Sequence, residues 1–345
     1  MELFINNAIL HIGNNESGET YLSNVELDID SDICYEFIQK HVKKLLNNPA
    51  AREAVFNAES AVYGVVQAFK EGELYFKDAS AQICERLLDM MKRNADIPPA
   101  DVIVVQFETR AKRGKRQKGE TLLDNEYLAI LKLNYREFFT HQTGDSENGR
   151  DNQIVKVRTA LPFNGGKVEE ACLIPYDPMI LKILEKPYIV DGEVTNYFSE
   201  LFLDCTPELS KKEVVQVLQE VSDEITEKHF NGDLETAAKV KVAVIDEAIE
   251  QDGTVSVFNI ANRVFTDNEE ARGEFVEMAK DLGVKPDVEL GEKFARQHFG
   301  THKFKASNGV EIKFPVELSD DLNAMEFTKN DDGSISITLK GLWQA

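Results

Sequence analysis

The hydrophobic pattern changes its period along this chain, and that change constrains the fold more than any other feature of the sequence. Over residues 32–46 apolar side chains recur at three- and four-residue steps, as a helix with one buried face requires. After Pro99 the period changes, because short runs rich in β-branched and aromatic residues alternate with turn-forming polar residues. Three such runs are DVIVVQFET, NEYLAILKLN and YREFFTHQ. Helices followed by a sheet predict an α+β fold class.

Other elements of the N-terminal part follow from the same patterns. An opening hairpin and two further helices are predicted, with the hairpin strands at 2–12 and 20–27 and the helices at 52–70 and 79–94. Two more strands, at 153–161 and 168–174, are predicted to form a second hairpin. The connecting PFNGGK favours this, because its asparagine and glycines adopt positive φ in a tight turn.

After Pro175 the pattern again favours helices, beginning in the region 183–205. A capping box opens the next helix at Ser210, where Glu213 follows at the required spacing. Later helices are predicted at 234–250, 256–264 and 267–282, the last of them opened by a capping box at Thr266 to Glu269. The chain closes with two strands around a hairpin turn at 330–333.

A length of 345 residues predicts more than one compact domain. The division predicted here is a mixed helix and antiparallel sheet domain over 1–175, followed by a mainly helical, acidic domain over 176–345 that ends in a β-hairpin. The distribution of charge supports the description of the C-terminal domain as acidic. Residues 171–345 contain 18 basic and 34 acidic side chains, whereas residues 1–170 contain 21 and 27.

Composition excludes several classes of protein. The net charge of -22, from 61 acidic and 39 basic residues, excludes a generally basic nucleic-acid coat. No apolar stretch approaches the roughly 20 residues that span a bilayer, and the N-terminus lacks the basic region of a secretory signal. The four cysteines are scattered, which favours reduced thiols over a zinc site or disulfides. A cytoplasmic protein is predicted, with no membrane partner.

The sharpest local feature is a basic segment at residues 110–118, in which six of nine residues are cationic and none is acidic. Its cations, the candidate DNA-binding residues, are Arg110, Lys112, Arg113, Lys115, Arg116 and Lys118. Because it lies between two predicted strands, we expect a protruding loop that contacts phosphates. If all six met phosphates, the logarithm of the binding constant would fall with that of salt at a slope of roughly -5.

Two questions about the basic segment stay open at this point. Its lysines could instead blunt a strand edge, as surface lysines commonly do. The second question is whether other cations lie on the same surface as the basic segment and extend it into a continuous track. The cations proposed for that track are Lys132, Arg136, Arg150, Lys156 and Arg158.

Other candidate sites are weaker. The helices predicted at 256–264 and 267–282 have the lengths of a helix-turn-helix unit, but six acidic residues in the second would repel DNA, which favours packing or dimerisation. His298 and His302 have the four-residue spacing of metal ligands, although Gly300 between them weakens a helix.

A metal-dependent nuclease would need converging carboxylates, and Asp101 and Glu108 are the candidates. Their odd separation places them on opposite faces of a regular strand, and Arg110 cannot replace a lysine with a tunable pKa. No phosphate-binding, dinucleotide-binding, zinc-protease or nucleophile-elbow motif is present. The sequence therefore predicts no enzyme, no cofactor, no metal and no small-molecule substrate.

Three stretches of the chain resemble a known family. They are the opening INNAILHIG, the central ILEKPYIVDGEVTNYFSELFLDCTPELSKKEV, and the closing FKASNGVEIKFPVELSDDLNAMEFTKNDDGSISITLKGL. Together they are similar to the bacterial nucleoid-associated protein NdpA (YejK-like) family. The resemblance implies a cytoplasmic protein at the nucleoid that is DNA-associated and has no established enzymatic activity. No DNA-contacting motif of the family carries over residue by residue, and the extended basic segment sets this chain apart.

These observations favour one function and leave two alternatives. The favoured function is weak binding to nucleoid DNA without sequence specificity through the basic segment, with a homodimer helping by presenting two such segments. The first alternative is an acidic protein-interaction module whose association with the nucleoid is indirect. The second is the metal-dependent nuclease described above.

Overall fold

The computed structural model describes residues 2–14, 19–110, 125–146, 149–305, 309, 311–319, 325–330 and 335–340. The chain forms two compact units, Met1–Ser210 and Lys211–Ala345. The sequence predicted the domain boundary at residue 175. In the structure the boundary follows Ser210, so the elements from 176 to 210 belong to the first unit. With this division the first unit holds 23 basic and 34 acidic residues and the second 16 and 27, and each has a net charge of -11. The negative charge is therefore shared equally between the units.

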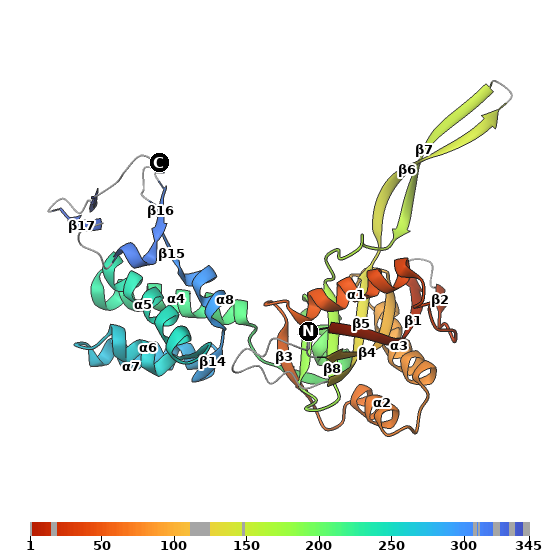
Figure 1. Cartoon of the computed structure of the whole chain (residues 1–345), viewed down its shortest axis with the longest axis horizontal. Helices are drawn as coiled ribbons and strands as arrows, with labels where there is room; N and C mark the ends of the chain where they lie inside the picture. Colours follow the sequence, from red (N-terminus) through yellow and green to blue (C-terminus); the bar gives the residue numbers. More distant parts are fainter. Residues whose placement is uncertain are drawn as a thin grey trace. The chain divides into compact units, whose positions relative to one another are not determined.

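An antiparallel sheet forms the centre of the first unit (Figure 1). Its eight strands lie in the order β12-β3-β9-β8-β5-β4-β1-β2. In chain order they are β1 (Glu2–Asn14), β2 (Glu19–Tyr21), β3 (Arg52–Phe56), β4 (Ala100–Arg110), β5 (Asn125–Asn134), β8 (Glu170–Pro175), β9 (Leu181–Leu184) and β12 (Cys205–Pro207). The opening hairpin is confirmed, since β1 pairs with β2. Strand β1 forms a longer ladder with β4.

Helices cover both faces of this sheet. Helix α1 (Asp32–Leu46) packs on one face, and α2 (Ala61–Lys70), α3 (Phe76–Arg93) and the π-helical turn η1 (Phe198–Leu203) pack on the other. Alternate residues of β5 serve the two faces, because Leu128 and Ile130 pack with α3 whereas Ala129 and Leu131 pack with α1. Burial on both sides explains the continuous apolar runs of the central strands, which confirm the α+β prediction.

Two helical predictions in the first unit need correction, those for 52–70 and for 183–205. In the first, only residues 61–70 are helical. Residues 52–56 form β3 rather than the start of a helix, because they pair with β9 and β12, which lie far away in the sequence. The helix begins only at Ala61, where the Ser60 hydroxyl accepts from the Tyr63 amide at 3.1 Å. Helix α1 has the predicted bounds, although Ile33 in its predicted apolar stripe is 85% exposed.

The region 183–205, predicted as helical, has short strands and irregular segments around a single helical turn. It contains β9, the short pair β10 (Tyr188–Val190) and β11 (Glu193–Thr195), the turn η1 and the first residue of β12. The turn between β10 and β11 uses positive φ at Asp191 and Gly192, which ends any helix there. Six residues of π-helix are the helical part of this region.

Strands β6 (Arg136–Ser146) and β7 (Gly149–Ala160) form a ribbon of their own that projects from the first unit (Figure 1). They pair with each other antiparallel along their whole length. The predicted hairpin between 153–161 and 168–174 is therefore wrong, because β7 pairs with β6 while β8 pairs with β5 and β9. Gly165 does adopt positive φ, but in a connection rather than in a hairpin turn.

The second unit is mainly helical. Its helices are α4 (Lys211–Phe230), α5 (Leu234–Glu250), α6 (Val257–Val264), α7 (Glu269–Asp281), α8 (Glu292–Phe299) and the short 3₁₀ turn η2 (Val316–Ser319). Its strand pairs are β13 (Thr254–Ser256) with β14 (Asp287–Glu289), β15 (Thr301–Lys305) with β16 (Glu311–Pro315), and β17 (Met325–Lys329) with β18 (Ile335–Leu339). No helix in the described part of the chain is long and apolar enough to cross a membrane.

The sequence predicted these helices well, with one error at a cap. Helix α5 has the predicted bounds, and α4 begins directly after Ser210. The N-cap of α7 is Asn268, whose side chain accepts from the Ala271 amide at 2.9 Å, and not Thr266. Thr266 instead donates its hydroxyl to carbonyls of the preceding helix. The predicted closing turn includes residues 331–334, which lie outside the described residues.

One contact between the sheet and α3 involves a buried histidine. Nε2 of the buried His11 lies 3.3 Å from the Ser80 hydroxyl, which itself donates to the Lys77 carbonyl, so Nε2 is the donor. Nδ1 has no hydrogen-bond partner in the described structure. Burial lowers the pKa of His11 from 6.5 to about 4.

Acid is therefore expected to destabilise the fold through His11. Because the unfolded chain binds the proton first, the stability supplied by neutral His11 is lost as pH falls from 6.5 towards 4. Between pH 7.5 and 5 this residue should account for about 2 kcal/mol of lost unfolding free energy. Urea titrations at both pH values, compared with His11→Leu, measure it. A variant with the same pH dependence as the wild type would contradict the assignment.

Candidate nucleic-acid interface

The basic segment begins at one end of the central sheet. Arg110 is the last residue of β4 and Asn125 the first of β5, and the two strands are paired at Thr109 and Asn125. The chain therefore leaves and re-enters the sheet through adjacent strands. Five of the six candidate residues lie outside the described residues, namely Lys112, Arg113, Lys115, Arg116 and Lys118.

Arg110, the sixth candidate, is held against the sheet. Its guanidinium forms an ion pair with the Glu108 carboxylate and lies over the Phe4 ring, 4.9 Å from the ring centre. The side chain stays 56% exposed, so a phosphate could still reach it. Its charge is nevertheless already compensated, and an exposed pair of this kind contributes little stability.

The sheet end around Arg110 is acidic. Glu2 lies opposite Arg110 across β1 and β4, and Glu126 lies opposite Glu108 across β4 and β5. Three carboxylates therefore accompany one guanidinium where the basic segment begins. The described residues at this end of the sheet therefore carry a net negative charge.

The structure places three of the cations considered for a continuous basic track. Lys132 is fully buried in β5, and Lys156 forms an ion pair with Glu137. Arg136 donates to the Lys167 carbonyl at 3.3 Å. Arg136 and Lys156 lie in the ribbon, beyond the Asn134 end of β5, which is about 30 Å from its Asn125 end at the usual rise per residue. Lys132 therefore cannot belong to a surface track, and the part of the basic segment beyond Arg110 lies outside the described residues.

Lys132 instead belongs to a buried polar cluster that the sequence analysis missed. It lies opposite Glu170 across β5 and β8, and its Nζ is 2.7 Å from the Glu170 carboxylate, with both side chains fully buried. Tyr197 and Tyr188 donate their hydroxyls to the two oxygens of that carboxylate. Nζ also donates to Asn134 at 2.6 Å. Both buried charges are thus paired and hydrogen-bonded.

Protonation in this cluster is set by burial and the central carboxylate. Burial lowers the pKa of Lys132, and the charge of Glu170 opposes that change. Burial and the same carboxylate raise the pKa values of Tyr188 and Tyr197 far above the usual range, so both remain donors. A lysine in LAILKLN and a glutamate in EACLIP, charges within apolar strands, were the available signals.

The residues considered for metal chemistry do not converge. Asp101 packs on the α1 face of β4, where it accepts from the Tyr135 hydroxyl at 2.7 Å, and Glu108 lies on the other face with Arg110. Burial raises the pKa of Asp101. His298 lies in α8 and His302 in β15, so they do not share a helix. Among the residues that the structure describes, no group of three or more histidine, cysteine or acidic side chains could hold a metal.

Helices α6 and α7 form the predicted helix pair, and their charges oppose DNA reading. The buried side of α7 carries Ala271, Phe275 and Ala279. Glu274 is paired with Lys228 and with His229, at 2.6 Å from the latter, and these partners lower its pKa. The exposed residues of α7 are mostly acidic, namely Glu269, Glu270, Glu277 and Asp281. Such a face would be repelled from a major groove.

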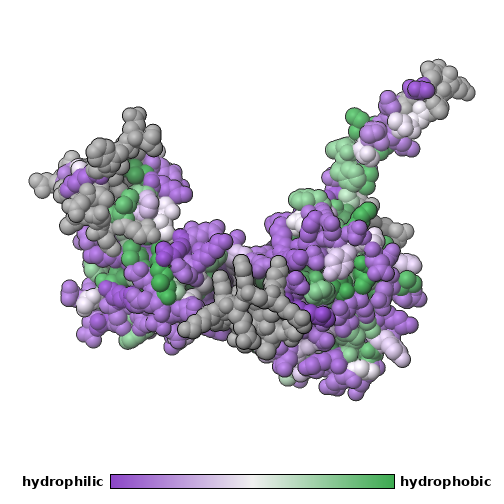
Figure 2. All heavy atoms as spheres, viewed as in Figure 1, coloured by the Kyte–Doolittle hydropathy of each residue, from purple (hydrophilic) through white to green (hydrophobic). Residues whose placement is uncertain are grey.

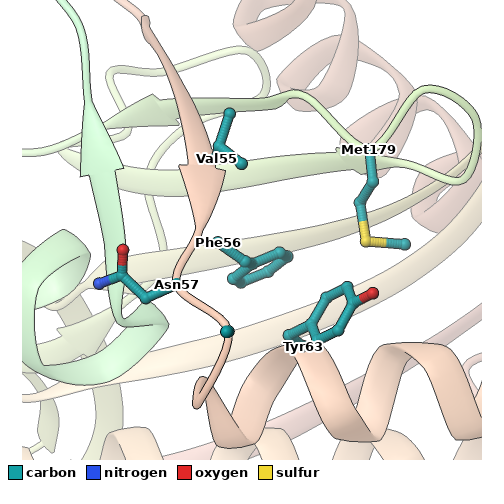
Figure 3. Close-up of a pocket in the computed structure, with 6 residues that line it drawn as sticks. Val55, Phe56, Asn57, Tyr63 and Met179 are labelled. Atoms are coloured by element: carbon teal, nitrogen blue, oxygen red, sulfur yellow. The ribbon is translucent and has the colours of Figure 1, made fainter.

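A pocket of about 410 Å³ opens where β3 and the segment before β9 diverge (Figure 3). It is lined by Val55, Phe56, Asn57, Ala58, Tyr63 and Met179. The amide group of Asn57 is already engaged, since it donates to Asp204 at 2.6 Å and accepts from Thr206 at 3.1 Å. The rest of the lining is apolar or aromatic, so this pocket does not suit a phosphate.

Comparison with models of known families identifies the family to which the chain belongs. A model of the nucleoid-associated protein YejK family matches residues 9–344, almost the whole length. The chain belongs to this family. The match confirms the resemblance inferred from the three sequence stretches and supports a nucleoid-associated role for this YejK-family chain. A search of curated proteins finds no match.

Proposed function

We propose that this YejK-family chain binds nucleoid DNA weakly and without reading its sequence, through the basic segment. The observation that carries the proposal is the concentration of six cations within nine residues of a chain whose net charge is -22. The described neighbours of the segment at the end of β4 and β5 are acidic, so the cations beyond Arg110 supply the attraction. Their contact with phosphates releases counterions, which is the main source of non-specific affinity.

Charge also explains why such binding would be weak. Each unit carries a net charge of -11, so DNA is repelled by both bodies and attracted only at the segment. Lysine and arginine contacts to phosphate fix position without reading bases. Steep salt dependence together with little sequence preference is therefore the expected signature.

Removing three cations from the segment is the test. Changing Arg113, Lys115 and Arg116 together to alanine should reduce the magnitude of the salt slope by about 2.7, because each lost phosphate contact removes about 0.9. Fluorescence anisotropy with a labelled duplex across a salt series measures the slope. Circular dichroism and thermal unfolding should remain unchanged.

A matched control separates local from overall charge. Changing Lys77, Lys92 and Arg93 on α3 to alanine removes the same charge from exposed positions of the same unit. This control should keep the wild-type slope to within about 0.5. Equal losses for the two variants would show that only net charge matters, and an unchanged slope in the segment variant would refute the proposal.

The exposed acidic residues of α7 favour one alternative, in which a basic protein connects the chain to the nucleoid. Glu269 is 94% exposed, and Glu270, Glu277 and Asp281 accompany it. Affinity capture from lysate treated with nuclease distinguishes the two functions. Under the DNA-binding proposal, nucleoid components should be lost from the captured material once DNA is digested, whereas a protein-mediated association would survive.

A further inference from the structure

The ladder between β3 and β9 stops before β3 ends. Its last pair joins Ala54 to Leu181. Because hydrogen-bonded pairs recur every second residue in an antiparallel ladder, the next one would join Phe56 to Met179. That pair does not form, and both residues instead line the pocket where the two segments diverge. The pocket therefore occupies a position beside β3 that a strand would otherwise fill.

The backbone N–H and C=O of Phe56 face this open position. The Glu53 carbonyl accepts from the Glu208 amide at 2.7 Å, and the Asn57 amide donates to the Asp204 carbonyl at 2.9 Å. Odd-numbered residues of β3 thus face β12. Since the direction alternates along a strand, Phe56 faces the other way, and no described residue pairs with its N–H or C=O. Unpaired groups of this kind are a template for a further strand.

Apolar side chains surround the open position. Figure 3 shows the rings of Phe56 and Tyr63 and the side chain of Met179 pointing toward one another, and the two ring centres are 5.7 Å apart. Val55 projects from the opposite face of β3 and is 57% exposed. Figure 2 shows mostly hydrophilic side chains on the viewed face of the first unit, so an apolar opening is a distinct local feature. Its volume of about 410 Å³ lies within the range of ligand sites.

The flanks of the pocket are acidic. Glu59 and Asp177 lie within two residues of its lining and are exposed, and the Asp204 carboxylate accepts a hydrogen bond from the lining. Lys70 is a cation in the same region, and its ammonium donates to the Tyr176 carbonyl at 2.8 Å. Three carboxylates against this ammonium favour a ligand whose apolar part is accompanied by positive charge.

We propose that this pocket binds an extended, basic segment of a partner protein, whose main chain pairs with Phe56 as an added strand. An apolar side chain of that segment enters between Tyr63 and Met179, and its lysine or arginine residues face the acidic flanks. Main-chain pairing provides affinity and the pocket provides specificity, as in other cases of strand addition. This contact does not involve the basic segment at 110–118 and is independent of DNA binding.

Titration of the full chain with a short peptide, in the absence of DNA, tests this proposal. The probe is the acetylated and amidated peptide lysine–valine–leucine–valine–lysine. With isotope-labelled methionine methyl groups the chain gives six signals, and that of Met179, assigned through Met179→Leu, should shift. Tyr63→Ala should weaken binding about tenfold or more. Tyr75→Ala, the same change at a 78% exposed position outside the pocket, should change it less than about twofold. Equal effects of the two variants, or an unmoved Met179 signal at millimolar peptide, would overturn the proposal.

Changes to the peptide test the pairing and the charge on the unaltered chain. A methyl group on the leucine amide nitrogen removes the donor for the Phe56 carbonyl and should weaken binding about threefold or more. Glutamate in place of both lysines should weaken it about fivefold or more at low salt, and this difference should shrink as salt rises. A methylated peptide with unchanged affinity would refute strand addition, and a glutamate peptide that binds equally well would refute recognition of a basic segment.

Discussion

Replacing Lys132 with methionine is expected to lower the free energy of unfolding by about 3–5 kcal/mol. The substitution keeps most of the aliphatic volume, so the loss does not come from a cavity. It comes from Glu170, whose fully buried carboxylate would lose the ammonium 2.7 Å away and keep the neutral donors of Tyr188, Tyr197 and Asn134. Breaking one partner of a buried pair leaves an uncompensated charge in a low-dielectric interior.

Urea unfolding at neutral pH measures this loss, and two further variants interpret it. The double change Lys132→Met with Glu170→Gln should recover more than half of it, because glutamine is neutral yet keeps an acceptor oxygen for Tyr197. Lys92→Met, at an exposed position on α3, should stay within about 0.5 kcal/mol of the wild type. A loss below about 1 kcal/mol for Lys132→Met would show that the pair is not energetically important.

Replacing Phe202 with alanine should cost a similar amount, about 3–5 kcal/mol, through a different mechanism. Phe202 is fully buried in the π-helical turn η1, with its ring 5.1 Å from that of Phe198 in the core on the α3 face. Arg86 donates to the carbonyls of Leu201 and Phe202 at 3.1 and 3.2 Å, so the backbone should stay in place and leave a cavity.

The neighbouring Leu201 provides the comparison for this second prediction. Its side chain is 41% exposed in the same turn, so Leu201→Ala should cost less than about 1 kcal/mol. Thermal or urea unfolding of both variants gives the difference. Equal losses would mean that helix propensity of the turn, rather than burial of Phe202, determines stability.

Local signals in the sequence predicted the helices with a clear apolar stripe. The bounds of α1 and α5 follow from periodicity, and the start of α4 from the residues around Ser210. Strand β3 could not be found this way, because its pairing with β9 and β12 involves residues more than 120 positions away. Pairing of that kind leaves no local trace in REAVF.

The hairpin predicted between 153–161 and 168–174 shows the same limit of local signals. Gly165 provides a genuine turn signal, yet the strands that flank it pair elsewhere. A turn residue reports the backbone conformation at one position and not which strands become neighbours. The β6–β7 ribbon was therefore divided between two predicted elements.

The candidate site, like the fold, could be predicted only in part from the sequence. Composition alone reveals the basic segment, but not that Arg110 at its start is paired with Glu108 and surrounded by carboxylates. Lys132 was grouped with surface cations because its partner Glu170 is 38 residues away. Register across β5 and β8, rather than charge, determines which lysine is buried.

The β6–β7 ribbon follows β5 directly after Asn134 and contributes no strand to the eight-stranded sheet. Insertions in the ribbon should therefore leave the core ladder intact. The ribbon is the place to graft an affinity tag or a fluorescent peptide without disturbing the helix-covered sheet.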